Sequence, residues 1–512
     1  MVGNCQSQVH LQLTQQEPNV YPIRLGTPEE FHSLREELPR LGFVQENMEG
    51  NFYLRHISEA EFDVQAKAPE APPAFGTLAA LFLQGKSVET ERVRQAVGDR
   101  SFALLKSLGL IEPHAASRRC IATVAMYATH GLYIVSDRWC GVDGQPFQPP
   151  VDVVYPAILG TTRGFLTMIP AAPCERFLEL CAGTGIAAFL AARNGAKHAY
   201  AFDIAARSVH FAEFNRRLNE LDNVTINEGD LYSPAADRTF DRIVAHPPYV
   251  PVLQPKYVFY DGGQDGEHIT RRIIEELPAH LEDRGLLVCV SLGSDRVDDP
   301  FERRVRSFLG ACHEEFDIAL FVRSEMEPAT QALNDVVRGR GNVEQVQIWR
   351  EVLQKLKIVS FVFGGIFIYR HGEKRKGYTI RRTMAEKAGL PEIKKLMEWE
   401  RQVARGEDMA ILQRSRLSAT VECRLTANYT LRERHWTPES QKLFTDAPFK
   451  MQLEAPEWTL QLLSECDGTR TGDELFESMK TQGIIHPETP FSDFADVLTV
   501  MVSGGYLSIS EP

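Results

Sequence analysis

The feature that most constrains this chain is a regular alternation of two kinds of segment between residues 150 and 371. Short apolar segments, typical of strands, alternate with longer amphipathic segments, typical of helices. Because strands joined through helices lie parallel in a sheet that the helices cover, this order predicts a Rossmann-like α/β domain with a mainly parallel sheet. We expect seven strands in it, at residues 176–180, 198–203, 224–229, 241–245, 286–292, 318–322 and 360–369.

The flanking segments have other patterns, and a chain of 512 residues has room for about three domains. Residues 1–26 are polar and Gln-rich, which predicts a flexible tail. Three short helices and two strands are expected in residues 27–150, as in a winged-helix-like recognition domain. The α/β domain follows at 151–371, and residues 372–512 predict a C-terminal α+β accessory domain that is also winged-helix-like. Within it, Lys374-Arg375-Lys376 is expected to be a solvated turn.

Charge and composition exclude several classes of protein. Lys and Arg total 56 against 69 Asp and Glu, and the net charge of −13 argues against non-specific binding to nucleic-acid phosphates. No apolar stretch is long enough to cross a membrane, and Met1 to Gln16 lacks the pattern of a signal peptide. The nine cysteines form no Cys-x-x-Cys pair, so we expect no disulfide framework, no metal site and a cytoplasmic location.

A glycine-rich turn follows the first expected strand. The sequence there is Glu179-Leu180-Cys181-Ala182-Gly183-Thr184-Gly185-Ile186. Such a turn lets the backbone approach a ligand closely and directs the first amides of the next helix toward it. Because the spacing also satisfies a relaxed dinucleotide fingerprint, a nicotinamide oxidoreductase and a purely structural turn are both alternatives.

Further polar residues end the next three expected strands. Asp203 ends the second, where a carboxylate can accept both hydroxyls of a ribose, and Glu228-Gly229-Asp230-Leu231 ends the third, where Asp230 can accept an adenine amino group. His246-Pro247-Pro248-Tyr249 ends the fourth. A single Asp at a strand end is usually a cap or turn residue, but this edge is where open α/β sheets bind ligands. The nicotinamide alternative leaves Asp230 and Pro-Pro-Tyr unexplained.

Together these segments resemble the class I S-adenosyl-L-methionine (SAM)-dependent methyltransferases over roughly residues 155–371. The Pro-Pro-Tyr segment is similar to that of the N-methyltransferases, which include the glutamine methyltransferases of translation release factors, the small-domain methyltransferases and the amino-methyltransferases of nucleic-acid bases. Asp261-Gly262-Gly263-Gln264-Asp265-Gly266, followed by Arg271-Arg272-Ile273, resembles a segment of the glutamine branch.

The resemblance implies SAM as the cofactor. Gly183 and Gly185 would make room for its methionine part and Glu179 would lie near its amino group, while a segment corresponding to 160–164 covers the cofactor in related enzymes. The residues expected to contact the cofactor are Glu179, Cys181, Ala182, Gly183, Thr184, Gly185, Asp203, Ile204, Gly229, Asp230, Leu231 and His246. Those expected to act in catalysis are His246, Pro247, Pro248 and Tyr249.

The expected catalytic residues suit a reaction in which the protein mainly positions the reactants, because methyl transfer is an in-line displacement. Pro247 and Pro248 remove two donors, so that main-chain carbonyls can turn toward the acceptor nitrogen. Tyr249 can stack on a planar acceptor or lie beside the sulfonium. The family normally has Asn at the position of His246, whose neutral ring accepts through one nitrogen and can also act as a general base.

The sequence leaves the acceptor open. We expect a nitrogen of a protein, glutamine-like, or of another macromolecule. The alternatives are a small-molecule or peptide acceptor with His246 as the base, and a non-catalytic SAM-fold interaction protein. The acidic charge balance favours protein, peptide or small-molecule partners over a specific nucleic acid. No membrane partner is expected.

Overall fold

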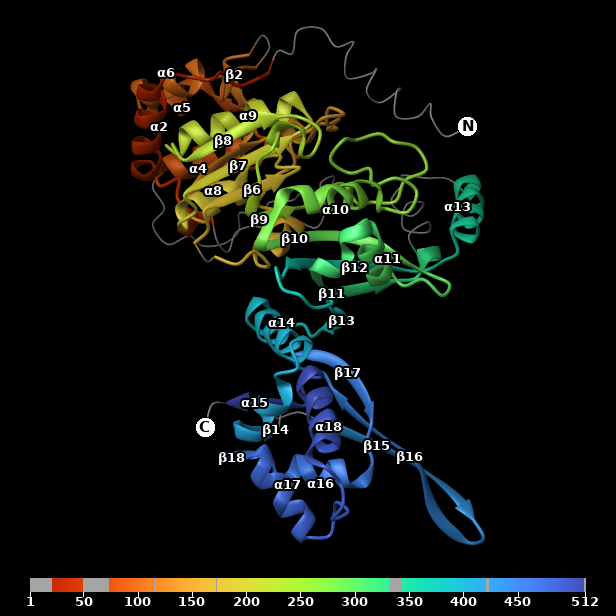
Figure 1. The fold of residues 1–512 in the computed structure, drawn as a ribbon. Helices are drawn as coiled ribbons and strands as arrows, with labels where there is room; N and C mark the ends of the chain where they lie inside the picture. The colour runs from red at the N-terminus through yellow and green to blue at the C-terminus, as the bar shows by residue number, and fades with distance from the viewer. Residues whose placement is uncertain are drawn as a thin grey trace. The chain divides into compact units, whose positions relative to one another are not determined.

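The computed structural model describes residues 21–48, 73–114, 117–171, 173–330, 343–419 and 423–510. Most of the predicted tail at 1–26 therefore lies outside the described residues. Figure 1 shows the helices and strands along the chain. The chain divides into two compact units, Met1–Ser291 and Leu292–Pro512. The finer division into four parts stays a prediction. Within the described ranges, no helix is both long and apolar enough to cross a membrane.

The first unit begins with short helices and small sheets. The helices are α2 (Pro28–Arg40), α3 (Gln45–Met48), α4 (Pro73–Phe82), α5 (Thr90–Val97) and α6 (Asp99–Ser107). One antiparallel sheet has the order β1 (Val88–Glu89), β3 (Arg119–Ala122), β2 (Ile111–Pro113), and β4 (Ala125–Thr129) forms a hairpin with β5 (Leu132–Ser136). The winged-helix description of this part stays a prediction.

Two buried asparagines fasten the β4–β5 hairpin to α9 (Ala206–Leu218). The Asn215 side chain accepts from the Val135 N–H at 2.7 Å and donates to the Val135 carbonyl at 3.0 Å. Asn219, the C-cap of α9, makes the same two bonds with Tyr133, at 2.9 and 2.6 Å. Side-chain amides thus satisfy backbone groups of β5 as a neighbouring strand would.

Five strands of the first unit form the parallel sheet that the sequence predicted. They are β6 (Arg176–Leu180), β7 (His198–Asp203), β8 (Val224–Glu228), β9 (Phe240–Ala245) and the first part of β10 (Leu281–Arg296). Their order is β8-β7-β6-β9-β10, and every neighbouring pair is parallel. Helices α8 (Ile186–Arg193), α9 and α10 (His268–His280) lie between successive strands of the sequence. Because the strand order reverses between β6 and β9, their carboxyl ends flank a topological switch point, where such sheets bind ligands.

The second unit holds the last two predicted strands. β11 (Phe316–Met326) and β12 (Ile358–Arg370) pair antiparallel, with α11 (Phe301–Phe308) before β11 and α13 (Val343–Leu356) between them. On its other side β11 pairs in parallel with β13 (Thr379–Met384), and the sheet continues through β17 (Phe449–Glu454) and β16 (His435–Thr445) to β15 (Cys423–Arg432). The prediction of seven strands is therefore not confirmed. In a seven-stranded sheet β11 would be an edge strand, but here C-terminal strands extend the sheet beyond it.

Helices and a small sheet complete the second unit. The helices are α14 (Leu390–Ala404), α15 (Asp408–Arg414), α16 (Glu457–Glu465), α17 (Gly472–Thr481) and α18 (Phe491–Ser503). The antiparallel sheet has the order β18 (Asp467–Thr471), β14 (Arg416–Ala419), β19 (Leu507–Ser510). They enclose a core that includes Leu412, Leu417, Leu462, Leu475 and Leu498. This part is α+β, as predicted, and its winged-helix description stays a prediction.

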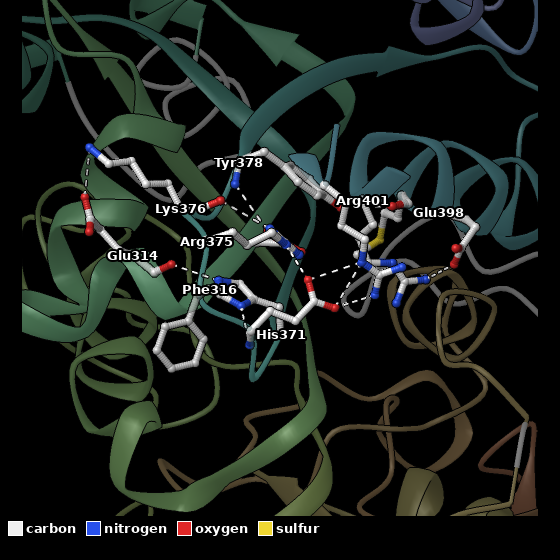
Figure 2. A network of polar contacts seen from close by, with 12 residues as sticks. Glu314, Phe316, His371, Arg375, Lys376, Tyr378, Glu398 and Arg401 are labelled. Atoms are coloured by element: carbon white, nitrogen blue, oxygen red, sulfur yellow. Dashed lines mark hydrogen bonds and ion pairs between the residues drawn. The ribbon is translucent and has the colours of Figure 1, made fainter. Parts of the chain in front are cut away.

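A network of ion pairs ties the segment after β12 to the start of β11 (Figure 2). The Asp317 side chain is 0% exposed and accepts from both terminal nitrogens of Arg375, at 2.8 and 2.6 Å. Arg375 also pairs with Glu373, which pairs in turn with Arg405. The expectation of a solvated turn at 374–376 is therefore wrong for Arg375, which is 10% exposed, because a buried carboxylate draws it inward.

Removal of the Asp317 carboxylate would leave Glu373 as the remaining carboxylate partner of the mostly buried Arg375. Because Arg375 loses two hydrogen bonds to a buried carboxylate but keeps Glu373, we expect Asp317→Ala to lower the free energy of unfolding of the second unit by about 1.5–3 kcal/mol. Lys376 is 84% exposed, so Lys376→Ala is the control and should change it by less than about 0.5 kcal/mol. Urea titration followed by circular dichroism measures both, and equal stability of the two variants would contradict the role of Asp317.

Candidate active site

The turn between β6 and α8 has residues in the left-handed conformation. The backbone φ is +54° at Cys181 and Gly183 and +80° at Gly185, the N-cap of α8. A Cβ on Gly185 would lie 2.7 Å from the Phe189 ring, so a side chain does not fit there. A Cβ on Gly183 would meet no heavy atom of the described residues within 4 Å. A side chain is therefore excluded at Gly185, whereas the space next to the Gly183 Cα holds no atom of the described residues.

The Asp203 carboxylate, at the end of β7, binds this turn. Its Oδ2 accepts from the Gly183 N–H at 2.8 Å and its Oδ1 from the Ala205 N–H at 2.9 Å. Burial raises the pKa of Asp203, and these two bonds act in the opposite direction by stabilising the charged form. The next residue, Ile204, exposes 36% of its surface, which leaves an apolar side chain accessible beside the carboxylate.

The Glu179 carboxyl group lies beneath the turn. It is 3% exposed, and its Oε2 accepts from the Ala188 N–H in the first turn of α8 at 2.8 Å. Burial raises the pKa of Glu179 to about 8, so the group is largely protonated at neutral pH. Ala182 and Thr184 are also buried, and the Thr184 carbonyl accepts from Asn215. These residues hold the shape of the turn.

The end of β8 lies beside the end of β7. The Gly229 N–H donates to the Asp203 carbonyl at 2.9 Å, and Leu231 is 7% exposed. The Asp230 side chain is 43% exposed and accepts two hydrogen bonds from Arg272 of α10, at 3.1 and 2.8 Å. Asp203 and Asp230 therefore follow neighbouring strands at the edge where the glycine-rich turn opens.

The His246 ring, just after β9, lies between two aromatic side chains. It stacks on Phe165 of α7 (Gly160–Leu166) with ring centres 5.3 Å apart and is tilted toward Tyr249 at 5.6 Å. Its Nε2 is buried and has no hydrogen-bond partner among the described residues. Burial lowers the pKa of His246 to about 4, so the ring is neutral at ordinary pH. Pro247, next in the chain, is buried.

The segment 261–266 supports the Pro-Pro-Tyr residues. The Gly262 N–H donates to the Val250 carbonyl at 2.9 Å, and the His268 N–H donates to the Gly262 carbonyl at 3.0 Å. A Cβ on Gly262 would lie 2.6 Å from the Tyr249 backbone, so glycine permits this close approach. The start of α10 is thereby connected to the loop that carries Tyr249.

The predicted residues of the turn and of the three strand ends come together along one edge of the sheet, but two further residues were missed. Phe165 lies one position past the segment 160–164 that was expected to cover the cofactor, and no sequence pattern indicated its contact with His246. Arg272 stands within a motif that the sequence did show, but its partner Asp230 lies 42 positions away. The cofactor and catalytic roles of the predicted residues stay predictions.

SAM fits these residues. Its methionine part needs an open backbone face, which Gly183 offers, and its ribose and adenine need the hydrogen-bond acceptors that Asp203 and Asp230 provide. The buried Nε2 of His246 indicates a partner that arrives with a ligand, since an unpaired buried polar group costs about 1–3 kcal/mol. Among the described residues, no cluster of His, Cys, Asp and Glu is placed to hold a metal ion.

Comparison with known proteins agrees with this geometry. Residues 159–314 match the family model described as methyltransferase small domain. A ribosomal protein uL3 glutamine methyltransferase of Bradyrhizobium diazoefficiens is 37% identical over 141 residues, which are 25% of this chain and 44% of that protein. A release factor glutamine methyltransferase of Thermodesulfovibrio yellowstonii is 33% identical over 125 residues, 22% of this chain and 45% of that protein. The chain thus spans less than half the length of these relatives.

The fold, the strand-end residues and these matches define a class I methyltransferase domain whose cofactor is SAM. Within that class, residues 159–314 match the model of the small-domain methyltransferases and are similar to the protein glutamine methyltransferases.

The two glycines of the turn predict different outcomes on substitution. Gly183→Ala should bind SAM at least about tenfold more weakly, because its methyl group enters the open space that a ligand would fill. It should also lose about 1–2 kcal/mol of stability, because the backbone there is left-handed. Gly185→Ala should destabilise the first unit further, by about 2–5 kcal/mol, because its methyl group clashes with Phe189 in addition to the strain of the left-handed backbone. Calorimetry with SAM and thermal unfolding separate the two effects. Normal SAM affinity in Gly183→Ala would place the cofactor elsewhere.

The raised pKa of Glu179 predicts that the stability of the first unit depends on pH. Because its folded-state pKa, about 8, lies above its ordinary value of 4.5, its contribution is fully present below about pH 4.5 and is lost as the pH rises through about 8. Glu179→Gln is uncharged at every pH and should therefore gain in melting temperature relative to the native chain across that interval. Thermal unfolding at closely spaced pH values measures this, and a constant difference between the two proteins would contradict it.

Proposed function

We propose that this chain is a SAM-dependent N-methyltransferase whose acceptor is a side-chain amide of a protein, of the glutamine type. The observation that carries the proposal is the buried Nε2 of His246, which has no hydrogen-bond partner in the described part of the chain. It lies beside Pro-Pro-Tyr at the edge where the predicted cofactor residues converge. The similarity of residues 159–314 to glutamine methyltransferases supports it.

The residues of β6, β7 and β8 would hold the cofactor, which supplies an electrophilic methyl group when bound. Asp203 fixes the open face of the turn through Gly183 and keeps lone pairs available for ribose hydroxyls. The exposed side chain of Ile204 offers an apolar surface for the adenine ring. Glu179 would act indirectly, because the hydrogen bond that its carboxyl group accepts from the Ala188 N–H fixes the first turn of α8.

His246 would orient the acceptor amide. A neutral imidazole accepts an N–H through one nitrogen, as the Asn carbonyl does in related enzymes. The flanking rings of Phe165 and Tyr249 hold the imidazole in one plane. As the new C–N bond forms, the amide nitrogen becomes far more acidic than an imidazolium, so that even this weakly basic Nε2 can receive its proton. Because Pro247 and Pro248 have no N–H, the main chain offers carbonyls to the second amide hydrogen.

The low basicity of His246 favours an amide over the small-molecule alternative. A general base is most effective when its pKa lies near the working pH. With a pKa of about 4, His246 is a weak base for deprotonating an amine or a hydroxyl. A hydrogen bond to an amide requires only the neutral ring. We further propose that the segments at 27–150 and 372–512 recognise the protein that carries the amide.

Transfer of a radiolabelled methyl group to fractionated protein, RNA, DNA and metabolites tests the proposed acceptor. Label should appear in protein, be stable to base as an N-methyl amide is, and release N-methylglutamine on complete proteolysis. Label in RNA, DNA or small molecules would contradict the proposed acceptor class.

Substitution of His246 tests its role. His246→Asn keeps an acceptor and should retain most activity, whereas His246→Ala should lower kcat/KM by about 10–100-fold, the effect of about 1–3 kcal/mol. SAM affinity, measured by calorimetry, should stay within about threefold in both variants. Equal activity of His246→Ala and the native enzyme would exclude the role.

The pH profile gives an independent check. Because burial lowers the pKa of His246 to about 4, the rate should show no step near 6.5, the ordinary value for histidine. A step near 6.5 that disappears in His246→Asn would show that the ring titrates normally and would favour the general-base alternative.

A further inference from the structure

Arg272 makes a two-point contact with a residue of the cofactor site. Its two terminal nitrogens donate to the two carboxylate oxygens of Asp230, at 3.1 and 2.8 Å. Such a bidentate contact fixes the plane of a carboxylate, which a single hydrogen bond leaves free to rotate. The side chains are 30% and 43% exposed, so the pair lies at the surface of the site. The fit of SAM to the site makes Asp230 an acceptor for the adenine but gives Arg272 no role.

The helix that carries Arg272, α10, is connected to the loop that carries Tyr249, where the proposed function places the acceptor. α10 begins directly after the segment 261–266, whose Gly262 touches the Tyr249 backbone and accepts from His268. His268 and Arg272 are four residues apart and share one face of the helix. The charge of Arg272 also reaches the glycine-rich turn, since it opposes the effect of burial that raises the pKa of Cys181. Arg272 therefore connects the first half of α10 with Asp230 at the end of β8.

We propose that Arg272 is a positioning residue that fixes the Asp230 carboxylate for recognition of the adenine 6-amino group. The inference rests on the proposed function, because that function assigns the cofactor to this edge. Each carboxylate oxygen has two lone pairs, and the bidentate pair uses one on each, so the others face away from Arg272. Without Arg272, ligand binding has to restrict the rotation of Asp230, which weakens affinity.

A purely structural ion pair predicts something different. Exposed pairs contribute little to stability, so loss of this one should barely alter unfolding. A structural role would also change the affinity for every cofactor analogue alike. A positioning role instead requires that the effect of Arg272 depends on Asp230 and on the 6-amino group of the base.

The test compares two ligands, S-adenosyl-L-homocysteine and S-inosyl-L-homocysteine, which has an oxygen in place of the 6-amino group. Calorimetry on the full chain should show that Arg272→Ala weakens binding of the adenosyl ligand by about three- to tenfold. This is the entropic cost of fixing one side chain, that of Asp230, when the ligand binds. Binding of the inosyl ligand should change by less than about twofold. In an Asp230→Ala background, Arg272→Ala should have no further effect on either ligand.

Two further variants complete the design. Arg272→Lys keeps the charge but loses the two-point contact, so it should reduce the preference for the adenosyl over the inosyl ligand as Arg272→Ala does. It serves as the test if Arg272→Ala fails to fold. Arg216 forms a comparable bidentate pair with Glu213 at 2.7 and 2.9 Å, on α9, and Arg216→Ala should leave both affinities unchanged.

Each outcome either supports or overturns the inference. Equal weakening of both ligands, additive effects of the Arg272 and Asp230 substitutions, or unchanged affinity in Arg272→Ala would each overturn it while the native chain still binds the adenosyl ligand. If the native chain binds neither ligand, the proposed function itself fails. The two kinds of failure are thus distinguishable.

Discussion

The contact on which the site depends most is the one between the Asp203 carboxylate and the backbone of the glycine-rich turn. One carboxylate oxygen accepts from Gly183 and the other from Ala205, so a single side chain joins the end of β7 to the turn after β6. The Asp203 carbonyl also accepts from Gly229 after β8. Three strand ends are therefore fixed relative to one another before any ligand binds, and the open face of Gly183 is a consequence of that bonding. Such preorganisation suits a reaction in which the protein mainly positions its reactants.

The two sides of the site differ in charge. Burial raises the pKa of Glu179 and lowers that of His246, so the groups under the turn and beside Pro-Pro-Tyr are neutral near pH 7. Asp230 lies nearer the surface and is paired with the guanidinium of Arg272. Neutral hydrogen-bonding groups suit an amide acceptor, because they bind it without separating charge in a buried place. A charged carboxylate suits a polar base edge at the surface.

Much of the α/β part could be predicted because its signals are local. The alternation of apolar and amphipathic segments predicted β6 to β12, and each of these strands is present near its expected position. The glycine-rich turn and the residues Asp203, Asp230 and His246 could be placed at one edge because parallel strands end on the same side of a sheet. The prediction of seven strands is not confirmed because β13 pairs with β11, and which strand pairs with which depends on contacts between segments far apart in the chain. Arg375 was taken for a solvated residue because its partner Asp317 lies 58 positions away.

The sequence by itself determined the class of fold, the edge of the sheet at which folds of this class bind ligands, and the residue types at that edge. Periodicity and turn chemistry depend only on neighbouring residues. The tertiary structure decided which of those residues are charged and which are paired. Burial between Phe165 and Tyr249 makes His246 a neutral group, and the approach of α10 gives Asp230 its bidentate partner. Protonation and pairing depend on solvent access and on distances between residues far apart in the chain, and these quantities exist only once the chain has folded.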